Sequence, residues 1–210
     1  MLAKHTCQYF APFASTSEAE YTTKYMTYLF VGLGNPGKEY DGTRHNVGRT
    51  ILSAWSASRG CTDFEFNKTC HGFVSKNKRA ILLLPETFMN NSGKAVGRTA
   101  LFFKIKPEHV ILLHDDVDIE LGRTKLSFNR SAAGHKGVES VRRALKTEKF
   151  WRIRIGVQKK KRVDAMKLVL LKFKGDEGAV VKKVSKKILE GLDLILEKGP
   201  ERAMNMINQN

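Results

Sequence analysis

The sequence predicts an α/β fold with a single domain, in which a twisted mixed sheet is flanked by helices. Three observations support this prediction. From Met26 onward, short apolar runs alternate with helical patterns, which is the rhythm of a layered α/β domain. The chain has 210 residues and 41% apolar content, enough for one sizeable core. It contains no internal repeat and no long low-complexity tract.

The expected strands are short runs dominated by apolar residues, a length and composition typical of sheet segments. In chain order they are Thr27–Val31, Gly72–Lys76, Ala80–Leu84, Val110–His114, Arg123–Phe128 and Arg152–Val157. The expected helices are Gly48–Ser58, Gly93–Phe103, His135–Thr147, Asp164–Leu171 and Asp176–Lys198. The last of these is amphipathic, with apolar residues on one face and lysines on the other.

Residues 1–26 are expected to form a flexible extension to a domain of residues 27–210. The segment is rich in Ser and Thr, has no Arg and carries Glu18 and Glu20, so it fits a mitochondrial presequence poorly and a secretory signal worse. Organelle targeting nevertheless stays open. We expect a protein of the cytoplasm or the mitochondrial matrix, and not a secreted one. No apolar run approaches the roughly 20 residues needed to cross a bilayer, so no membrane partner is expected.

The charge balance favours a polyanionic partner. Lys and Arg number 37 against 21 Asp and Glu, a net charge of +16 that places a positive potential over much of the surface. Nucleic acid is the favoured partner, and a basic surface kept for solubility is the alternative. The cysteines Cys7, Cys61 and Cys70 are widely spaced and lack the Cys/His spacing of a zinc site, so neither structural zinc nor a disulfide framework is expected.

The string Gly32-Leu-Gly-Asn-Pro-Gly37 follows the first expected strand and has the spacing of a dinucleotide-binding fingerprint. That fingerprint needs a helix opening on its last glycines and an acidic residue about 20 positions later. Here Pro36 interrupts the turn, a polar loop follows, and Ser53–Arg59 contains no acidic residue. A nicotinamide-dependent oxidoreductase is therefore disfavoured.

Chemistry is expected in the polar loop after this string, because α/β sheets place their active sites at strand ends. The loop contains His45, which can accept a proton from water near neutral pH. A carboxylate that orients the ring would come from His114-Asp-Asp-Val-Asp118, and the sequence leaves open whether it is Asp115 or Asp116. Two other interpretations of this segment also stay open. They are a magnesium site of Asp115, Asp116, Asp118 and Glu120, and an acidic turn without a role.

A third segment, Thr87-Phe-Met-Asn-Asn-Ser-Gly93, joins a strand to a helix. Asn90 offers an amide that can donate to a developing oxyanion or hold the attacking water. Phe88 fits either core packing or a platform for a base or sugar. The chain has no G-x-S-x-G elbow, and activated water is the expected nucleophile.

A fourth segment, Asn129-Arg-Ser-Ala-Ala-Gly-His-Lys-Gly137, leads into a helix whose N-terminus attracts phosphate, with Arg130 and Lys136 adding charge. Arg142 and Arg143 extend the basic character along this helix. Such a run is usually a solvated face. Beside a phosphate-attracting terminus, however, we expect it to meet an RNA backbone.

Five groups of residues occur together in one order and spacing. They are Gly32–Gly37 with Tyr40 and Thr43–Asn46, Phe88–Asn90 with Ser92 and Gly93, His114–Asp118 with Gly122, Gly134–Gly137, and Phe150–Gly156. In these motifs the chain resembles the bacterial-type peptidyl-tRNA hydrolase family. The resemblance implies a monomeric, phosphorylase/hydrolase-like α/β fold without cofactor or metal. It also implies hydrolysis of N-blocked aminoacyl-tRNA to free peptide and tRNA.

The resemblance assigns roles to individual residues. His45 would be the general base and Asp115 its orienting carboxylate. Asn35 would sense the peptide bond that distinguishes peptidyl-tRNA from aminoacyl-tRNA, and Asn90 would hold substrate and water. Tyr40 and Phe88 would contact the tRNA end.

Two departures from the family pattern affect one loop. Lys136 stands where the family usually has asparagine, and Asn129-Arg-Ser-Ala-Ala133 replaces a glycine-rich run. Lysine only donates and adds a point charge, which weakens water positioning and strengthens phosphate attraction, while less glycine implies a stiffer loop. The changes support a second hypothesis, an RNA-binding relative without activity, like some organellar splicing factors. The presence of His45, Asp115, Asn35 and Asn90 argues against it.

Overall fold

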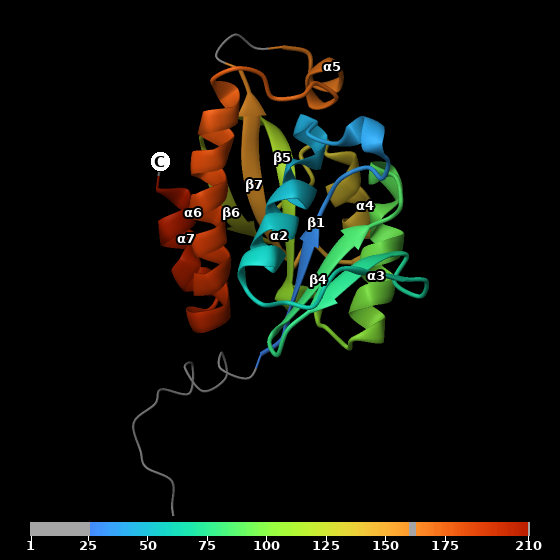
Figure 1. Cartoon of the computed structure of the whole chain (residues 1–210). Helices are drawn as coiled ribbons and strands as arrows, with labels where there is room; N and C mark the ends of the chain where they lie inside the picture. Colours follow the sequence, from blue (N-terminus) through green and yellow to red (C-terminus); the bar gives the residue numbers. More distant parts are fainter. Residues whose placement is uncertain (1–25, 160–162, 210) are drawn as a thin grey trace, which may run out of the picture.

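The computed structural model describes residues 26–159 and 163–209. Within these ranges, seven strands form one mixed sheet with the order β2-β3-β4-β1-β5-β7-β6 (Figure 1). The strands are β1 Tyr28–Gly32, β2 Glu65–Asn67, β3 Gly72–Lys76, β4 Ala80–Pro85, β5 Val110–Glu120, β6 Thr124–Phe128 and β7 Trp151–Gln158. Strands β4, β1, β5 and β7 are parallel, and the pairs β2/β3, β3/β4 and β6/β7 are antiparallel. The carboxyl ends of the central strands therefore share one edge of the sheet.

Helices cover both faces of this sheet (Figure 1). They are α2 Val47–Ser58, α3 Ser92–Phe102, α4 Lys136–Leu145, α5 Ala165–Val169, α6 Glu177–Lys198 and α7 Pro200–Asn208. Short 3-10 turns span Lys38–Tyr40 (η1), Arg44–Asn46 (η2), Met89–Asn91 (η3) and Pro107–His109 (η4). Helices α2, α6 and α7 pack on one face and α3 and α4 on the other, whereas α5 lies beyond the ends of β5 and β7.

Alternate side chains of the central strands enter two separate cores. Phe30 and Ile111 pack with Trp55 of α2 and with apolar residues of α6 and α7. Leu29 and Leu112 pack on the opposite face with apolar residues of α3 and α4. Parallel strands covered on both faces need apolar side chains at every position, which explains the continuous apolar runs that predicted them.

The predicted fold is confirmed, and most of the expected strands and helices have ends within one or two residues of the prediction. Two elements were missed. Strand β2 is a three-residue edge strand with mostly exposed side chains, and its partner is β3. Helix α7 follows Gly199, whose φ of 85° ends α6, and begins at Pro200. The predicted extension lies almost wholly outside the described residues, so the boundary at residue 27 stays a prediction.

Strand β5 is longer than predicted, and this changes the interpretation of the acidic segment. The strand was expected to end at His114, but it continues to Glu120 and pairs with β7 across an irregularity between Asp116 and Glu120. The interpretation of this segment as an acidic turn was therefore wrong, because the carboxylates lie on a strand. In the described ranges, no helix is long and apolar enough to cross a bilayer.

Candidate active site

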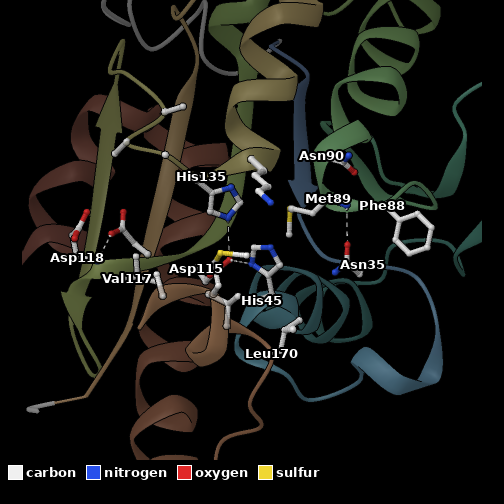
Figure 2. A pocket seen from close by; sticks show the side chains of 18 residues that line it. Asn35, His45, Phe88, Met89, Asn90, Asp115, Val117, Asp118, His135 and Leu170 are labelled. Carbon is white, nitrogen blue, oxygen red and sulfur yellow. Dashed lines mark hydrogen bonds and ion pairs between the residues drawn. The ribbon is translucent and has the colours of Figure 1, made fainter. Parts of the chain in front are cut away.

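A cavity of about 580 Å³ opens at the carboxyl edge of the sheet (Figure 2). Six of the predicted site residues line it, namely Asn35, His45, Phe88, Asn90, Asp115 and Lys136. They come from the loop after β1, the η2 turn, the η3 turn, strand β5 and the start of α4. The fold thus brings together residues that are far apart in the sequence.

His45 and Asp115 form a hydrogen-bonded pair. Nδ1 of His45 lies 2.8 Å from Oδ1 of Asp115, whose side chain is buried. An ionised carboxylate only accepts hydrogen bonds, so the neutral ring carries its proton on Nδ1 and a lone pair on Nε2. Burial by itself would raise the pKa of Asp115, but electrostatic attraction and hydrogen bonds from His135 and His45 hold that pKa well below its usual range. Asp115 therefore stays ionised.

The alternation of side chains along β5 decides which aspartate meets His45. Asp115 continues the set of Ile111 and Leu113, which face α2, and the turn that carries His45 directly precedes α2. Asp116 has the opposite orientation, and its Oδ2 accepts a hydrogen bond of 2.6 Å from Nε of Arg154 on β7. The question that the sequence left open is thus answered in favour of Asp115.

His135 is a site residue that the sequence analysis did not single out. Its Nε2 lies 3.0 Å from the same Oδ1 of Asp115, and its ring lies 5.2 Å from that of His45, centroid to centroid (Figure 2). Its Nδ1 accepts hydrogen bonds from the backbone N–H groups of Gly137 and Val138, so His135 is the N-cap of α4. The sequence signal was a histidine directly before an amphipathic helix, but histidine is an uncommon cap.

The donor set for a metal differs from the one considered from the sequence. Among the described residues, the group of His, Cys, Asp and Glu side chains close enough to share an ion is His45, Asp115 and His135, without Asp116, Asp118 or Glu120. His135 fits such a role poorly, because Nδ1 accepts two N–H groups and Nε2 must keep the proton of the neutral ring. The magnesium set that the sequence left open as an alternative is not assembled among the described residues.

The backbone that carries His45 is fixed by its neighbour Arg44. The Arg44 side chain is fully buried, with Nη2 2.7 and 2.8 Å from the two carboxylate oxygens of Glu177 on α6, and Nη1 donating to the carbonyl of Val157. Gly48 holds the other side of the turn. A Cβ there would lie 2.1 Å from the carbonyl oxygen of Leu113, so only glycine lets α2 start this close to β5.

Asn35 is oriented by three hydrogen bonds. Its backbone N–H and carbonyl bond to the side-chain amide of Asn46 at 2.8 and 2.9 Å. Its own Oδ1 accepts a hydrogen bond of 2.8 Å from the backbone N–H of Met89 (Figure 2). Because the amide oxygen is occupied, the Nδ2 group of Asn35 is the part of the side chain left to meet a substrate.

The remaining predicted residues divide into two groups. Phe88, Asn90 and Lys136 are exposed on the wall of the cavity. Tyr40, in η1, and the basic residues Arg130, Arg142 and Arg143 are not among the residues that line it. Arg142 and Arg143 both donate hydrogen bonds to Glu139, one helical turn earlier on α4.

Helix α5 supplies an apolar wall that the sequence analysis did not assign to the site. Ala165, Met166, Val169 and Leu170 line the cavity opposite the polar residues. The side chains of Met166 and Leu170 are 72% and 54% exposed, which is unusual for large apolar residues. The helix expected at Asp164–Leu171 is confirmed as α5, but its sequence did not predict that it faces the cavity.

The loop before α4 adopts backbone conformations that suit glycine although it contains little of it. Asn129, Ala133 and Gly134 have φ values of 51°, 46° and 78°. A non-glycine residue in this left-handed region costs roughly 1 kcal/mol or more. Ala133 therefore holds a strained conformation at the point where the chain turns to present His135.

A mixed sheet with a histidine–carboxylate pair at its carboxyl edge is an arrangement that α/β enzymes use to activate water. The family model described as peptidyl-tRNA hydrolase matches residues 29–210. The peptidyl-tRNA hydrolase of Aquifex aeolicus is 41% identical over 86% of this chain and 96% of its own length. That of Caldanaerobacter subterraneus subsp. tengcongensis is 39% identical over 86% of this chain and 99% of its own length.

The crystal structure of peptidyl-tRNA hydrolase from Acinetobacter baumannii superposes with a TM-score of 0.79 at 30% sequence identity, covering 87% of this chain and 94% of that one. The chain belongs to the peptidyl-tRNA hydrolase family. The resemblance drawn from the motifs is thus confirmed, and the hypothesis of an RNA-binding relative without activity is not favoured.

Proposed function

We propose that this chain hydrolyses the ester bond between a peptide and the 3′ end of its tRNA, with His45 as the base that activates water. The observation that carries the proposal is the His45–Asp115 pair, in which Asp115 accepts a hydrogen bond from Nδ1–H and the lone pair of Nε2 is left for a water molecule in the cavity. An ester is a suitable substrate for activated water, because its alkoxide leaves more readily than an amine. Its hydrolysis therefore needs no side-chain nucleophile.

The reaction follows in two steps. Nε2 of His45 removes a proton from water while the oxygen attacks the ester carbonyl, and the charge of Asp115 stabilises the imidazolium that forms. The tetrahedral intermediate then collapses, the bond to the ribose oxygen breaks, and His45 returns the proton to that oxygen. The products are a peptide with a free carboxyl group and a tRNA with a free 3′-terminal ribose.

Two amides are placed to recognise the acyl part of the substrate. Asn35 presents Nδ2 as a donor because its Oδ1 is held by Met89. That donor fits the carbonyl oxygen of the peptide bond next to the ester, which an unblocked aminoacyl group lacks. Asn90 lies exposed on the same cavity wall and is proposed to hold the substrate and the attacking water. The apolar face of α5 would receive peptide side chains.

The tRNA is proposed to bind through its backbone and its last bases. The net charge of +16 favours this partner, and Lys136 brings a positive charge into the cavity beside the first turn of α4. Phe88, with 57% of its side chain exposed, offers a stacking surface for a terminal base, and Tyr40 a second contact. Arg130, Arg142 and Arg143 would add contacts to phosphates farther away.

We also propose that the enzyme works as a monomer, as the family resemblance implies. Its substrate is found where proteins are synthesised. This is consistent with either of the compartments expected from the sequence, the cytoplasm or the mitochondrial matrix.

The test is release of free tRNA from N-acetyl-aminoacyl-tRNA by the purified chain in the presence of EDTA, with the unblocked aminoacyl-tRNA alongside. We expect rapid cleavage that EDTA does not inhibit and that is confined to the blocked substrate. An Asn35→Ala variant should lose this selectivity, because the proposed donor to the peptide carbonyl is gone. Binding of tRNA without cleavage of either substrate would overturn the proposal.

A further inference from the structure

Both ring nitrogens of His135 are engaged, and their partners fix its tautomer. Nδ1 lies 3.2 Å from the backbone nitrogen of Gly137 and 3.3 Å from that of Val138. Backbone N–H groups only donate, so Nδ1 must be the nitrogen without a proton. The proton of the neutral ring therefore lies on Nε2, which is 3.0 Å from Oδ1 of Asp115 (Figure 2).

The same contacts need Nδ1 of His135 as an acceptor. A proton on Nδ1 would break both hydrogen bonds to the first turn of α4 and place a positive charge at the positive end of the helix. His135 is thus a fixed N–H donor. If the Asp115 side chain rotated away, its buried carboxylate would lose the hydrogen bond from Nε2–H of His135. Leaving a buried charge without such a bond costs free energy.

A third histidine completes the support. Nδ1 of His114 donates a 2.6 Å hydrogen bond to the backbone carbonyl of Asp115, and its ring packs edge to face on that of His135 at 4.6 Å between centroids. The side chain of Asp115 is therefore held by His135 and its backbone by His114. His45 is the partner of Asp115 whose second nitrogen is left for the cavity.

We propose that His135 is a positioning residue, whose Nε2–H bond holds the Asp115 carboxylate in the orientation that aligns His45 for proton transfer. This role rests on the proposed function. It predicts that His135 acts on the rate of the chemical step and not on tRNA binding. Helix α4 contributes its first backbone N–H groups. They donate to Nδ1 of His135, so the ring proton lies on Nε2, which faces Asp115.

Two substitutions separate this role from capping of the helix. The oxygen of an asparagine side chain reaches as far as Nδ1 of histidine, so His135→Asn keeps the cap and loses the donor to Asp115. The amide nitrogen of glutamine reaches as far as Nε2, so His135→Gln keeps the donor and loses the cap. Thermal unfolding of both variants shows the effect on the fold.

We expect His135→Asn to lower kcat about 10- to 100-fold, the value of one hydrogen bond to a charged group, with KM and tRNA affinity unchanged. His135→Gln should restore most of the rate although it is the less stable variant. The inference is overturned if His135→Asn keeps kcat within about twofold of the wild type, or if the rate follows stability and not the donor. A wild-type chain that cleaves no peptidyl-tRNA would instead contradict the proposed function.

Nitrogen NMR of the histidine-labelled chain gives a readout that does not depend on activity. The His135 ring, identified by its absence from the variant spectra, should show a protonated Nε2 and an unprotonated Nδ1. His45 should show the opposite tautomer in its neutral form. A protonated Nδ1 on His135 would overturn the inference even if the variants were slow.

Discussion

His45 and His135 contact the same oxygen of Asp115, yet they are held in opposite ways. Asp115 accepts a hydrogen bond from Nδ1–H of His45, and the cavity lies on the other side of that ring. The same carboxylate accepts a hydrogen bond from Nε2–H of His135, whose other nitrogen is occupied by the start of α4. The comparison teaches that the partner of the second nitrogen decides the chemistry. A histidine that faces a cavity can take a proton, and one that faces a helix terminus can only donate.

The largest effect should come from His45. We expect His45→Ala to lower kcat by at least about 10³-fold, because no other ring at the site has an unoccupied nitrogen toward the cavity. The affinity for tRNA, measured with an uncharged tRNA, should change little since the backbone contacts remain. A His45→Ala enzyme with near-normal turnover would contradict the assignment of the two histidines.

The shared carboxylate should come next. Asp115→Asn keeps the shape of the side chain but removes the charge that stabilises the imidazolium of His45. It also replaces one of the two acceptor oxygens of the carboxylate by an NH2 donor. We expect kcat to fall about 10²- to 10³-fold with little change in KM. Asp116→Asn is the matched control, since Asp116 lines the same cavity but bonds to Arg154 and not to His45. Equal losses in the two variants would show that the comparison is wrong.

A double variant tests whether His135 acts through His45. If it does, His135→Asn in the His45→Ala background should slow the residual reaction by less than about threefold, although the single variant has a clear effect. Independent contributions would instead multiply. The measurement is single-turnover release of tRNA at high enzyme concentration, which detects slow variants. Multiplied losses would indicate that His135 contacts substrate or water directly.

Much of the fold could be predicted from the sequence, because each buried strand and amphipathic helix leaves a local pattern. Strand β2 and helix α7 were missed for different reasons. Glu65–Asn67 has too few apolar residues to indicate a strand, and α7 was masked by the long pattern of α6 until Gly199 and Pro200. The order of the strands in the sheet depends on packing between distant residues, so local sequence patterns do not predict it.

The candidate site was predicted in part. Residues in local motifs were identified, whereas contacts that depend on the packing of distant elements were not. The motifs indicated His45, Asn35 and Asp115, and the structure places them around one cavity. The contact of His135 with Asp115 could not be predicted, since it depends on the start of α4 lying next to Asp115 of β5. The apolar wall of α5 was missed because an amphipathic helix does not reveal which surface it faces.

The smallest effect concerns His114, whose ring is buried without facing the cavity. Burial lowers the pKa of His114 well below 6.5, helped by electrostatic interactions with His135 and Arg152 and opposed by those with Asp115. Below pH 6.5 the unfolded chain therefore binds a proton that the folded chain does not, and the stability falls as the pH falls. The contribution is at most about 1.4 kcal/mol per pH unit below that point.

His114→Asn removes this titration while keeping a donor for the carbonyl of Asp115. Its free energy of unfolding in urea should depend less on pH between 7.5 and 5.5, roughly the range over which an ordinary histidine titrates, than that of the wild type. His109, whose pKa is lowered first by burial, titrates in both proteins and cancels in the difference. Parallel pH profiles would mean that His114 accepts a proton in the folded state. The buried ring would then not be the neutral support for Asp115 and His135 that its contacts indicate.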